Sequence, residues 1–123
     1  MEFKFNLPRY CNNDDRLCVQ LLLDELCRWG RVISVHDGEE WMLKKCSDPD
    51  LVLDTLSHTG EDTIDVFDRL GHHLGQFWLI YNNGSEGDPM ICITDYTANK
   101  FCETVVNHIQ LRLDGDDNGI TND

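Results

Sequence analysis

The stretch TIDVFDRLGHHLGQFWLIY, residues 63–81, decides the fold. Residues 63–68 predict a β-strand, with polar and apolar residues alternating up to Val66. A turn follows at 70–73, where Gly71 tolerates backbone angles that other residues avoid. Residues 75–81 form a second, strongly apolar run. Because apolar side chains occur there at both parities, we expect both faces of that strand to be covered.

Two further elements are expected after this hairpin. Residues 90–96 predict a third strand, after a loop at 82–89 that contains Asn-Asn-Gly and Pro. Thr97 offers a capping oxygen for a helix at 98–113. The inward side chains of that helix recur at helical spacing: Cys102, Val105, Val106, Ile109 and Leu113. The C-terminal half is therefore predicted to be a three-stranded meander followed by a helix.

The N-terminal half is expected to mix helices and strands. An apolar stripe at helical spacing predicts a helix at 15–29, which Gly30 ends. The other elements expected in this half are strands at 2–7, 31–36 and 41–45 and a short helix at 51–57. Asp37-Gly38 is a strong hairpin signal between the second and third of these strands.

Most neighbouring strands are thus joined by hairpins, which favours an α+β fold over a parallel α/β one. We predict a mostly antiparallel sheet of about five to six strands, packed by about three helices. Residues 1–113 are expected to form a single domain, because 123 residues suit one hydrophobic core. Residues 114–123 are mostly Asp, Gly and Asn, and predict an acidic flexible tail.

Six cysteines occur in the chain: Cys11, Cys18, Cys27, Cys46, Cys92 and Cys102. The first residues show no apolar run of signal-peptide length, and no stretch is long enough for a membrane span. We therefore expect a cytoplasmic protein with reduced thiols, several of them acting as small buried hydrophobes. Their even number leaves a disulfide framework open as the alternative.

The charge is strongly unbalanced, with 23 acidic against 10 basic residues and a net charge of −13. Binding to nucleic acid or to an anionic membrane needs clustered Lys and Arg, so both are disfavoured as direct partners. The imbalance is also uneven along the chain. Residues 1–50 carry a net charge of −3, and residues 51–123 carry −10 with only three basic residues.

The acidic half predicts a binding surface for a basic protein. Carboxylates on one face of a strand lie about 6 to 7 Å apart, which approaches the spacing of duplex phosphates. Trp41, after a charged hairpin, is the best candidate for an exposed interface aromatic. The residues predicted to bind a partner are Glu61, Asp62, Asp65, Asp68, Asp88, Asp95 and Trp41.

Candidate chemical sites are weak in comparison. Asp114 to Gly119 matches only the first half of a calcium loop, because the chain ends before the bidentate Glu. His72 and His73 lie in a predicted turn, without the spacing of zinc ligands on a helix. Cys46 follows two lysines that favour its thiolate, but nothing places a His beside it. We therefore expect no catalytic residue, no metal and no cofactor, and keep an enzyme or metal protein using these groups as a third alternative.

The leading hypothesis is a non-enzymatic acidic inhibitor that covers a basic nucleic-acid-binding surface. Phages and plasmids encode small acidic proteins of this kind against host defence, as anti-CRISPR or anti-restriction DNA mimics, an analogy of charge and size. The expected partner is a nuclease or another nucleic-acid-binding effector. The alternative is an accessory cytoplasmic α+β domain, in which the acidity serves only solubility and which forms a homodimer.

Overall fold

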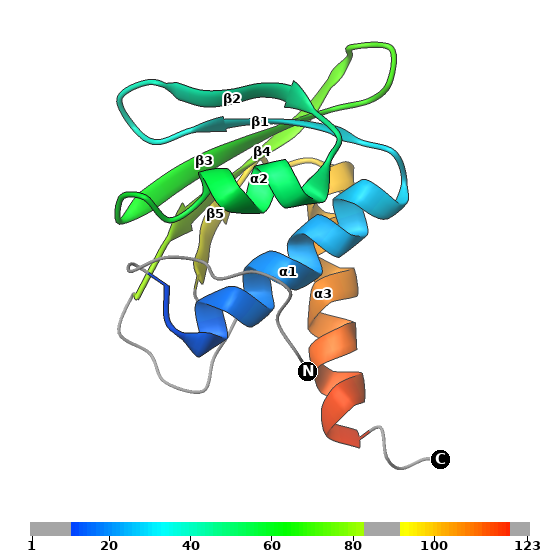
Figure 1. The fold of residues 1–123 in the computed structure, drawn as a ribbon. Helices are drawn as coiled ribbons and strands as arrows, with labels where there is room; N and C mark the ends of the chain where they lie inside the picture. The colour runs from blue at the N-terminus through cyan, green and yellow to red at the C-terminus, as the bar shows by residue number, and fades with distance from the viewer. Residues whose placement is uncertain (1–10, 83–91, 119–123) are drawn as a thin grey trace.

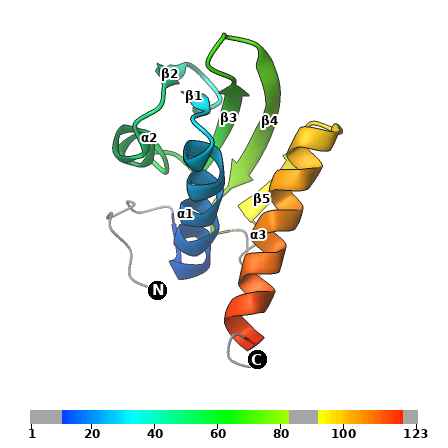
Figure 2. The ribbon, with the colours of Figure 1, turned by 90° about the vertical axis from the view of Figure 1, so that its right-hand side faces the viewer.

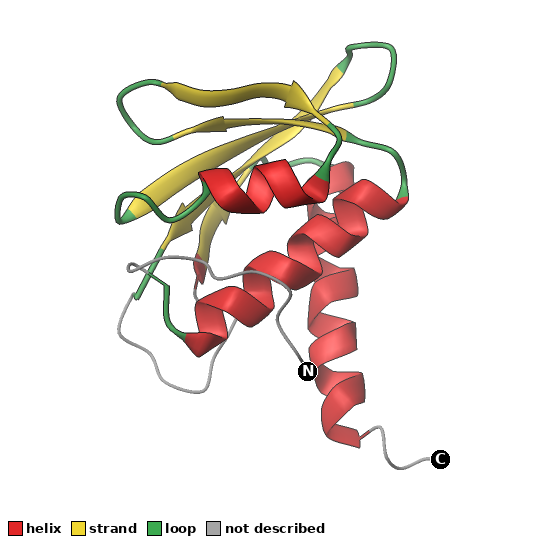
Figure 3. Cartoon of the chain, in the orientation of Figure 1, coloured by secondary structure: helices red, strands yellow, loops and turns green. Residues whose placement is uncertain are grey.

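A five-stranded antiparallel sheet with helices packed on one of its faces forms the frame of the protein (Figures 1 and 3). The computed structural model describes residues 11–82 and 92–118. The helices are α1 (Asn13–Arg28), α2 (Pro49–Thr55) and α3 (Lys100–Asn118). The strands are β1 (Val32–His36), β2 (Trp41–Cys46), β3 (Glu61–Phe67), β4 (His73–Ile80) and β5 (Ile93–Tyr96), in the order β2-β1-β3-β4-β5. The prediction of a single α+β domain with a mostly antiparallel sheet is confirmed; the expected strand at 2–7 lies outside the described residues.

The predicted hairpin and meander form the centre and one edge of the sheet. In the β3–β4 pairing Ile64 lies opposite Phe77, and Phe77 in turn lies opposite Tyr96 of β5. The turn between β3 and β4 is closed by the Asp68 carboxylate, which accepts hydrogen bonds from the backbone N–H groups of Leu70 and His72, both at 2.9 Å.

Alternate residues of the strands face opposite environments. On the helix side, the side chains of Ile33, Val35, Ile64, Val66, Phe77 and Leu79 are buried. Figure 2 shows α1 between α2 and α3 beneath this side of the sheet. On the other side Trp78 is 36% exposed and Ile80 is also exposed. The expectation that both faces of this strand are covered is therefore wrong, because the described helices all pack on one face.

Helix α1 is the most deeply buried helix, and its N-terminus is fixed by Asp15. The Asn12 side chain accepts a hydrogen bond from the Asp15 N–H at 2.8 Å, and the Asp15 carboxylate accepts one from the Asn12 N–H at 3.1 Å. This reciprocal pattern is a capping box. The same carboxylate accepts a third hydrogen bond, from the Asn82 N–H at 2.7 Å. Asp15 therefore ties the start of α1 to the end of β4.

Helix α3 begins and ends later than the sequence pattern suggests. Its first turn is capped by Asn99, whose side-chain oxygen accepts a hydrogen bond from the Cys102 N–H. Thr97, the expected cap, instead accepts a hydrogen bond from the Gln76 N–H in β4. The helix continues to Asn118, supported by a Gln110–Asp114 side-chain hydrogen bond one turn apart. The flexible tail expected from 114 thus starts with helix, and residues 119–123 lie outside the described part.

Gly75 sets the distance between α3 and the sheet. A Cβ atom at this position would collide with Cys102 Sγ on α3. The absence of a side chain therefore lets the helix approach β4 closely. No positive φ is required there, so the need for glycine at this position is purely one of space.

We predict that Gly75→Ala lowers the free energy of unfolding by about 1 to 3 kcal/mol, because it overpacks the contact between α3 and β4. Chemical denaturation of the variant measures this loss. Gly60→Ala is the matched control, since a Cβ there meets nothing within 4 Å and stability should change little. Adding Cys102→Ala to Gly75→Ala should recover part of the loss; a purely additive double variant would contradict the proposed collision.

Candidate functional site

Asp62, one of the predicted binding residues, points into the protein. Its carboxylate accepts a hydrogen bond from the Tyr81 hydroxyl at 2.6 Å and another from the Ser57 N–H at 2.8 Å. Burial raises the pKa of the Asp62 carboxyl to about 6, and the two hydrogen bonds offset only part of this effect. Asp62 therefore joins α2, β3 and the end of β4 and is not presented to a partner.

Asp65 and Asp68 are also occupied by their own hairpin. Asp65 is buried on the far side of the sheet, where its carboxylate lies 2.8 Å from His73 Nε2. Asp68 accepts the turn hydrogen bonds and lies 3.0 Å from His72 Nδ1. Hydrogen bonding from the His72 backbone holds the pKa of Asp68 below its usual value. The expected row of free carboxylates along β3 is therefore absent, because the row serves to close and fix the hairpin.

Of the four other residues predicted to bind a partner, three are exposed and one is not described. Trp41, Glu61 and Asp95 are exposed, on three different strands. Asp88 lies outside the described residues. By register and burial, these three belong to the uncovered side of the sheet, here called the open sheet face. Its side chains include Val32, Ser34, His36, Trp41, Lys45, Glu61, Thr63, Asp65, Phe67, His73, Gln76, Trp78, Ile80 and Asp95.

Large apolar side chains are spread over the open sheet face. Trp41 is 45% exposed and makes an edge contact with His36, with ring centroids 4.9 Å apart. Trp78 has Thr63 on one side and Asp95 on the other as its cross-strand neighbours. Such partly exposed tryptophans are common anchors of protein interfaces.

An acidic group at one end of the sheet was missed by the sequence reasoning. The turn between β1 and β2 carries Asp37, Glu39 and Glu40, and the side chain of Glu61 reaches Gly38 of the same turn. We name these four carboxylates the acidic end. A charge count by chain segment does not indicate the acidic end, because three of its four carboxylates lie in residues 1–50, the less acidic part of the chain. The hairpin signal at Asp37-Gly38 was the clue that acids there would project from the edge of the sheet.

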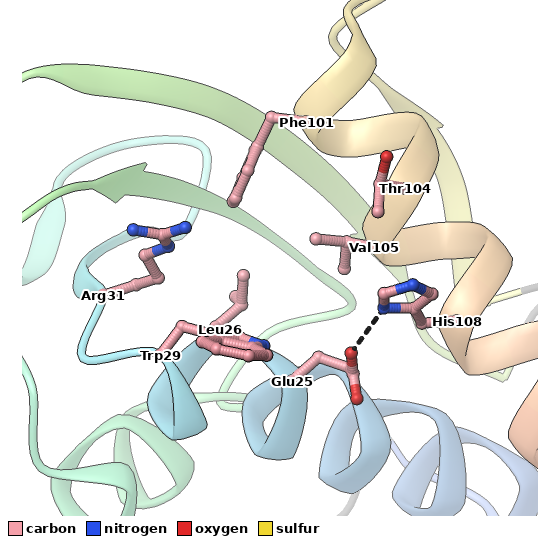
Figure 4. A pocket seen from close by; sticks show the side chains of 8 residues that line it. All are labelled: Glu25, Leu26, Trp29, Arg31, Phe101, Thr104, Val105 and His108. Carbon is pink, nitrogen blue, oxygen red and sulfur yellow. Dashed lines mark hydrogen bonds and ion pairs between the residues drawn. The ribbon is translucent and has the colours of Figure 1, made fainter.

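A groove of about 320 Å³ lies between α1 and α3 on the other side of the molecule (Figure 4). Its walls are mainly apolar, with Leu26 and Trp29 from α1 and its C-cap, and Phe101 and Val105 from α3. At one end Glu25 lies 3.1 Å from His108 Nδ1. We call this hollow the α1–α3 groove. The sequence pattern placed Trp29 in the inward stripe of one helix and Phe101 at the edge of another, and it gave no sign that these two helices lie side by side.

The His, Cys and Asp residues considered as metal ligands or nucleophiles do not form one site in the described part of the chain. Among residues 11–82 and 92–118, no cluster of three or more His, Cys, Asp or Glu side chains is placed to hold a metal ion. All six cysteines are free thiols. Burial raises the pKa of Cys11 and of Cys27 to about 11, so these two thiols stay protonated at neutral pH. The Cys46 sulfur accepts a hydrogen bond from the Asp48 N–H, next to the start of α2.

Comparison with known proteins does not add to this description. No family model, no curated protein and no solved structure matches the chain. Over the same described residues, none of the helices combines the length and the apolar character that a membrane crossing requires.

The buried Asp62 predicts a distinct pH dependence of stability. Its folded pKa of about 6 exceeds the ordinary 3.8, so the folded state retains a proton that the unfolded state has lost between these values. The contribution of Asp62 to stability should therefore fall as pH rises from about 4 to 6, by an amount on the order of 1 to 2 kcal/mol.

The measurement compares wild type with Asp62→Asn in denaturant titrations over this pH range. The variant cannot ionise, so its stability relative to wild type should increase toward neutral pH, on top of a constant offset from altered hydrogen bonds. Asp54→Asn, at an exposed position of α2, is the control and should run parallel to wild type. Parallel curves for Asp62→Asn as well would contradict the burial of an ionisable carboxyl.

Proposed function

We propose that this chain is a non-enzymatic binding protein that covers a basic, nucleic-acid-binding surface of another protein with its open sheet face. The partner would be a nuclease or CRISPR effector, and the protein a phage- or plasmid-encoded inhibitor of host defence acting in the cytoplasm. The observation that carries the proposal is Trp78, 36% exposed on β4 of an uncovered sheet face and opposite the exposed Asp95 of the edge strand β5.

The chemistry of this face around Trp78 suits a basic partner, whereas Lys44 and Lys45 line its other part beside Trp41 and Phe67. A guanidinium or ammonium group placed over an exposed Trp gains a cation–π attraction of about 0.5 to 2 kcal/mol. Asp95 lies opposite Trp78 and Glu61 lies opposite Ile80, so each exposed apolar side chain has a carboxylate as its cross-strand neighbour. Aromatic groups flanked by carboxylates are therefore a combination that Arg-rich surfaces recognise.

The acidic end extends this region past the edge of the sheet. Asp37, Glu39, Glu40 and Glu61 gather around the β1–β2 turn: Glu39, Glu40 and Glu61 are exposed, and the Asp37 carboxylate accepts hydrogen bonds from the Glu39 and Glu40 N–H groups. Their summed potential would steer a positively charged protein toward this side and make association sensitive to salt. Imitation of DNA would thus depend on this group of acids together with Asp95, in place of a strand-spaced row of Asp62, Asp65 and Asp68.

The test is displacement of labelled duplex DNA from a panel of purified restriction nucleases and CRISPR effectors, followed by fluorescence anisotropy. We expect the protein to displace DNA from at least one member, more strongly at low than at high salt. Replacing Glu61 by Gln together with Asp95 by Asn should weaken this displacement about tenfold or more, since both acids lie at the proposed contact.

The matched control removes the same charge from the helices, with Asp54→Asn and Glu103→Gln, both exposed. This variant should compete almost as well as wild type. Equal losses in the two variants would mean that only total charge matters. Failure to displace DNA from any panel member would count against the proposal.

A second candidate is a homodimer formed through the same face. The exposed Trp41, Trp78 and Ile80 supply the apolar area that a dimer needs. In this accessory role the acidity would serve solubility alone. Sizing chromatography separates the two candidates: a dimer that Trp78→Ala dissociates, without any DNA displacement, favours the second.

A further inference from the structure

Three of the few basic side chains of the chain gather in one shallow hollow. Arg28 and Arg31 flank the end of α1, and Arg69 comes from the β3–β4 turn. The hollow has a volume of about 490 Å³, and we call it the arginine hollow. Gly30 allows this gathering, because a Cβ there would lie 2.6 Å from the Arg69 guanidinium. Residues 40 positions apart in the chain thus form one positive site in a protein of charge −13.

The positive charges of the arginine hollow are poorly neutralised by the chain itself. Only Arg28 has an ion pair, with Glu25 at 3.7 Å; within residues 11–82 and 92–118, Arg31 and Arg69 have none. The Arg31 guanidinium lies over the Phe101 ring at 5.4 Å, and its Nε is buried without a hydrogen-bond partner. Asp68 brings one negative charge to the hollow, but its carboxylate accepts hydrogen bonds from the Leu70 and His72 N–H groups and forms no ion pair with an arginine of the described residues. The guanidinium groups therefore remain available to an external anion.

The arginine hollow continues into the α1–α3 groove. Trp29 and Arg31 line both, so the positive region and the apolar region share a wall. Trp29 is 61% exposed, and Leu70, across the hollow, is 83% exposed. Figure 4 shows Arg31 at one end of the groove and His108 at the other, with the apolar side chains between them. Exposed apolar groups next to unpaired arginines are typical of a surface that is covered in a complex.

We propose that this continuous surface binds an acidic peptide segment of a partner protein. The carboxylates of the segment would pair with Arg31 and Arg69, and one large apolar side chain would enter the α1–α3 groove. The groove volume lies at the small end of ligand pockets, roughly 300 to 1,000 Å³, which suits one side chain better than a larger ligand.

A peptide fits this surface better than a phosphate or a nucleic acid. Phosphate binding would leave the apolar groove and Trp29 unused. A nucleic acid strand would bring many negative charges against a protein of net charge −13. A short acidic segment with an apolar anchor brings little charge and uses both parts of the surface.

The arginine hollow and the α1–α3 groove are separate from the open sheet face. Glu61 begins β3 and Phe67 ends it, so the acidic end and Arg69 lie at opposite ends of the same strand. A basic partner on the open sheet face and an acidic segment in the arginine hollow would therefore be recognised separately. Variants at one site should leave binding at the other intact.

The experiment uses the whole chain and three fluorescein-labelled short peptides of the same length. The first contains Asp and Glu around a central Trp, the second has Ala in place of Trp, and the third has Asn and Gln in place of the acids. Fluorescence anisotropy at low salt should show binding of the first peptide and weaker binding of the other two, each by about tenfold or more. Single-stranded DNA and tripolyphosphate serve as alternative anions.

Two variants test the assignment of the arginines. Arg28→Gln with Arg69→Gln, both at exposed positions, should weaken binding of the first peptide at least about tenfold. Arg31→Gln should do the same, and the exposed pair keeps the test valid should Arg31→Gln fail to fold. Lys44→Gln with Lys45→Gln removes equal charge from β2 and should leave binding unchanged.

Several results would overturn the proposal. They are equal binding of the acidic and the neutral peptide, unchanged binding by the Arg28 and Arg69 double variant, an equal loss in the Lys44 and Lys45 variant, and tighter binding of DNA or tripolyphosphate than of the peptide. Self-association that disappears in the arginine variant, without peptide binding, would assign the surface to a second copy of the chain and also overturn it.

Discussion

The pairing of β3 with β4 is the constraint on which the rest of the structure depends. It places Ile64 beside Phe77 on the side that the helices cover, and Thr63 beside Trp78 on the side that they leave open. A slip of one residue would exchange these two sets, moving apolar side chains into solvent and Trp78 into the core. Because the helices occupy one side only, this single register determines both the hydrophobic core and the open sheet face.

The acidic residues of β3 lie on both faces of the sheet, and they have different hydrogen-bond partners on each face. Asp62 lies on the helix side and accepts hydrogen bonds from Tyr81 and Ser57. Asp65 lies on the open side and pairs with His73. Leaving such groups unpaired in a buried place would cost several kcal/mol by order of magnitude, so their partners are needed for the hairpin to be stable. Part of the acidity of this protein is thus structural.

Helices and strands could be predicted from the sequence, but the contacts between their side chains could not. Alternation at 63–68 and the helical stripe at 15–29 depend on local spacing, and both were predicted near their true bounds. The burial of Asp62 was not predictable, because Tyr81 and Ser57 reach it from other elements. The arginine hollow was not predictable either, since Arg69 meets Arg28 and Arg31 only once the hairpin has folded over Gly30. Trp41 was correctly expected to be exposed, because a charged hairpin turn precedes it directly.

The opposite ends of β1 and β3 carry opposite charges among the described residues: Asp37, Glu39, Glu40 and Glu61 at one end, and Arg28, Arg31 and Arg69 at the other. Across the described residues the sheet therefore has a dipolar charge distribution along its strands, which Asp68 beside the arginines reduces, in addition to the net charge of the chain. A charged body approaching from a distance of about one Debye length, ~10 Å at ordinary salt, would exert a torque on such a dipole. The molecule would rotate into one preferred orientation before any side chain made contact, which shortens the search for the correct docking geometry.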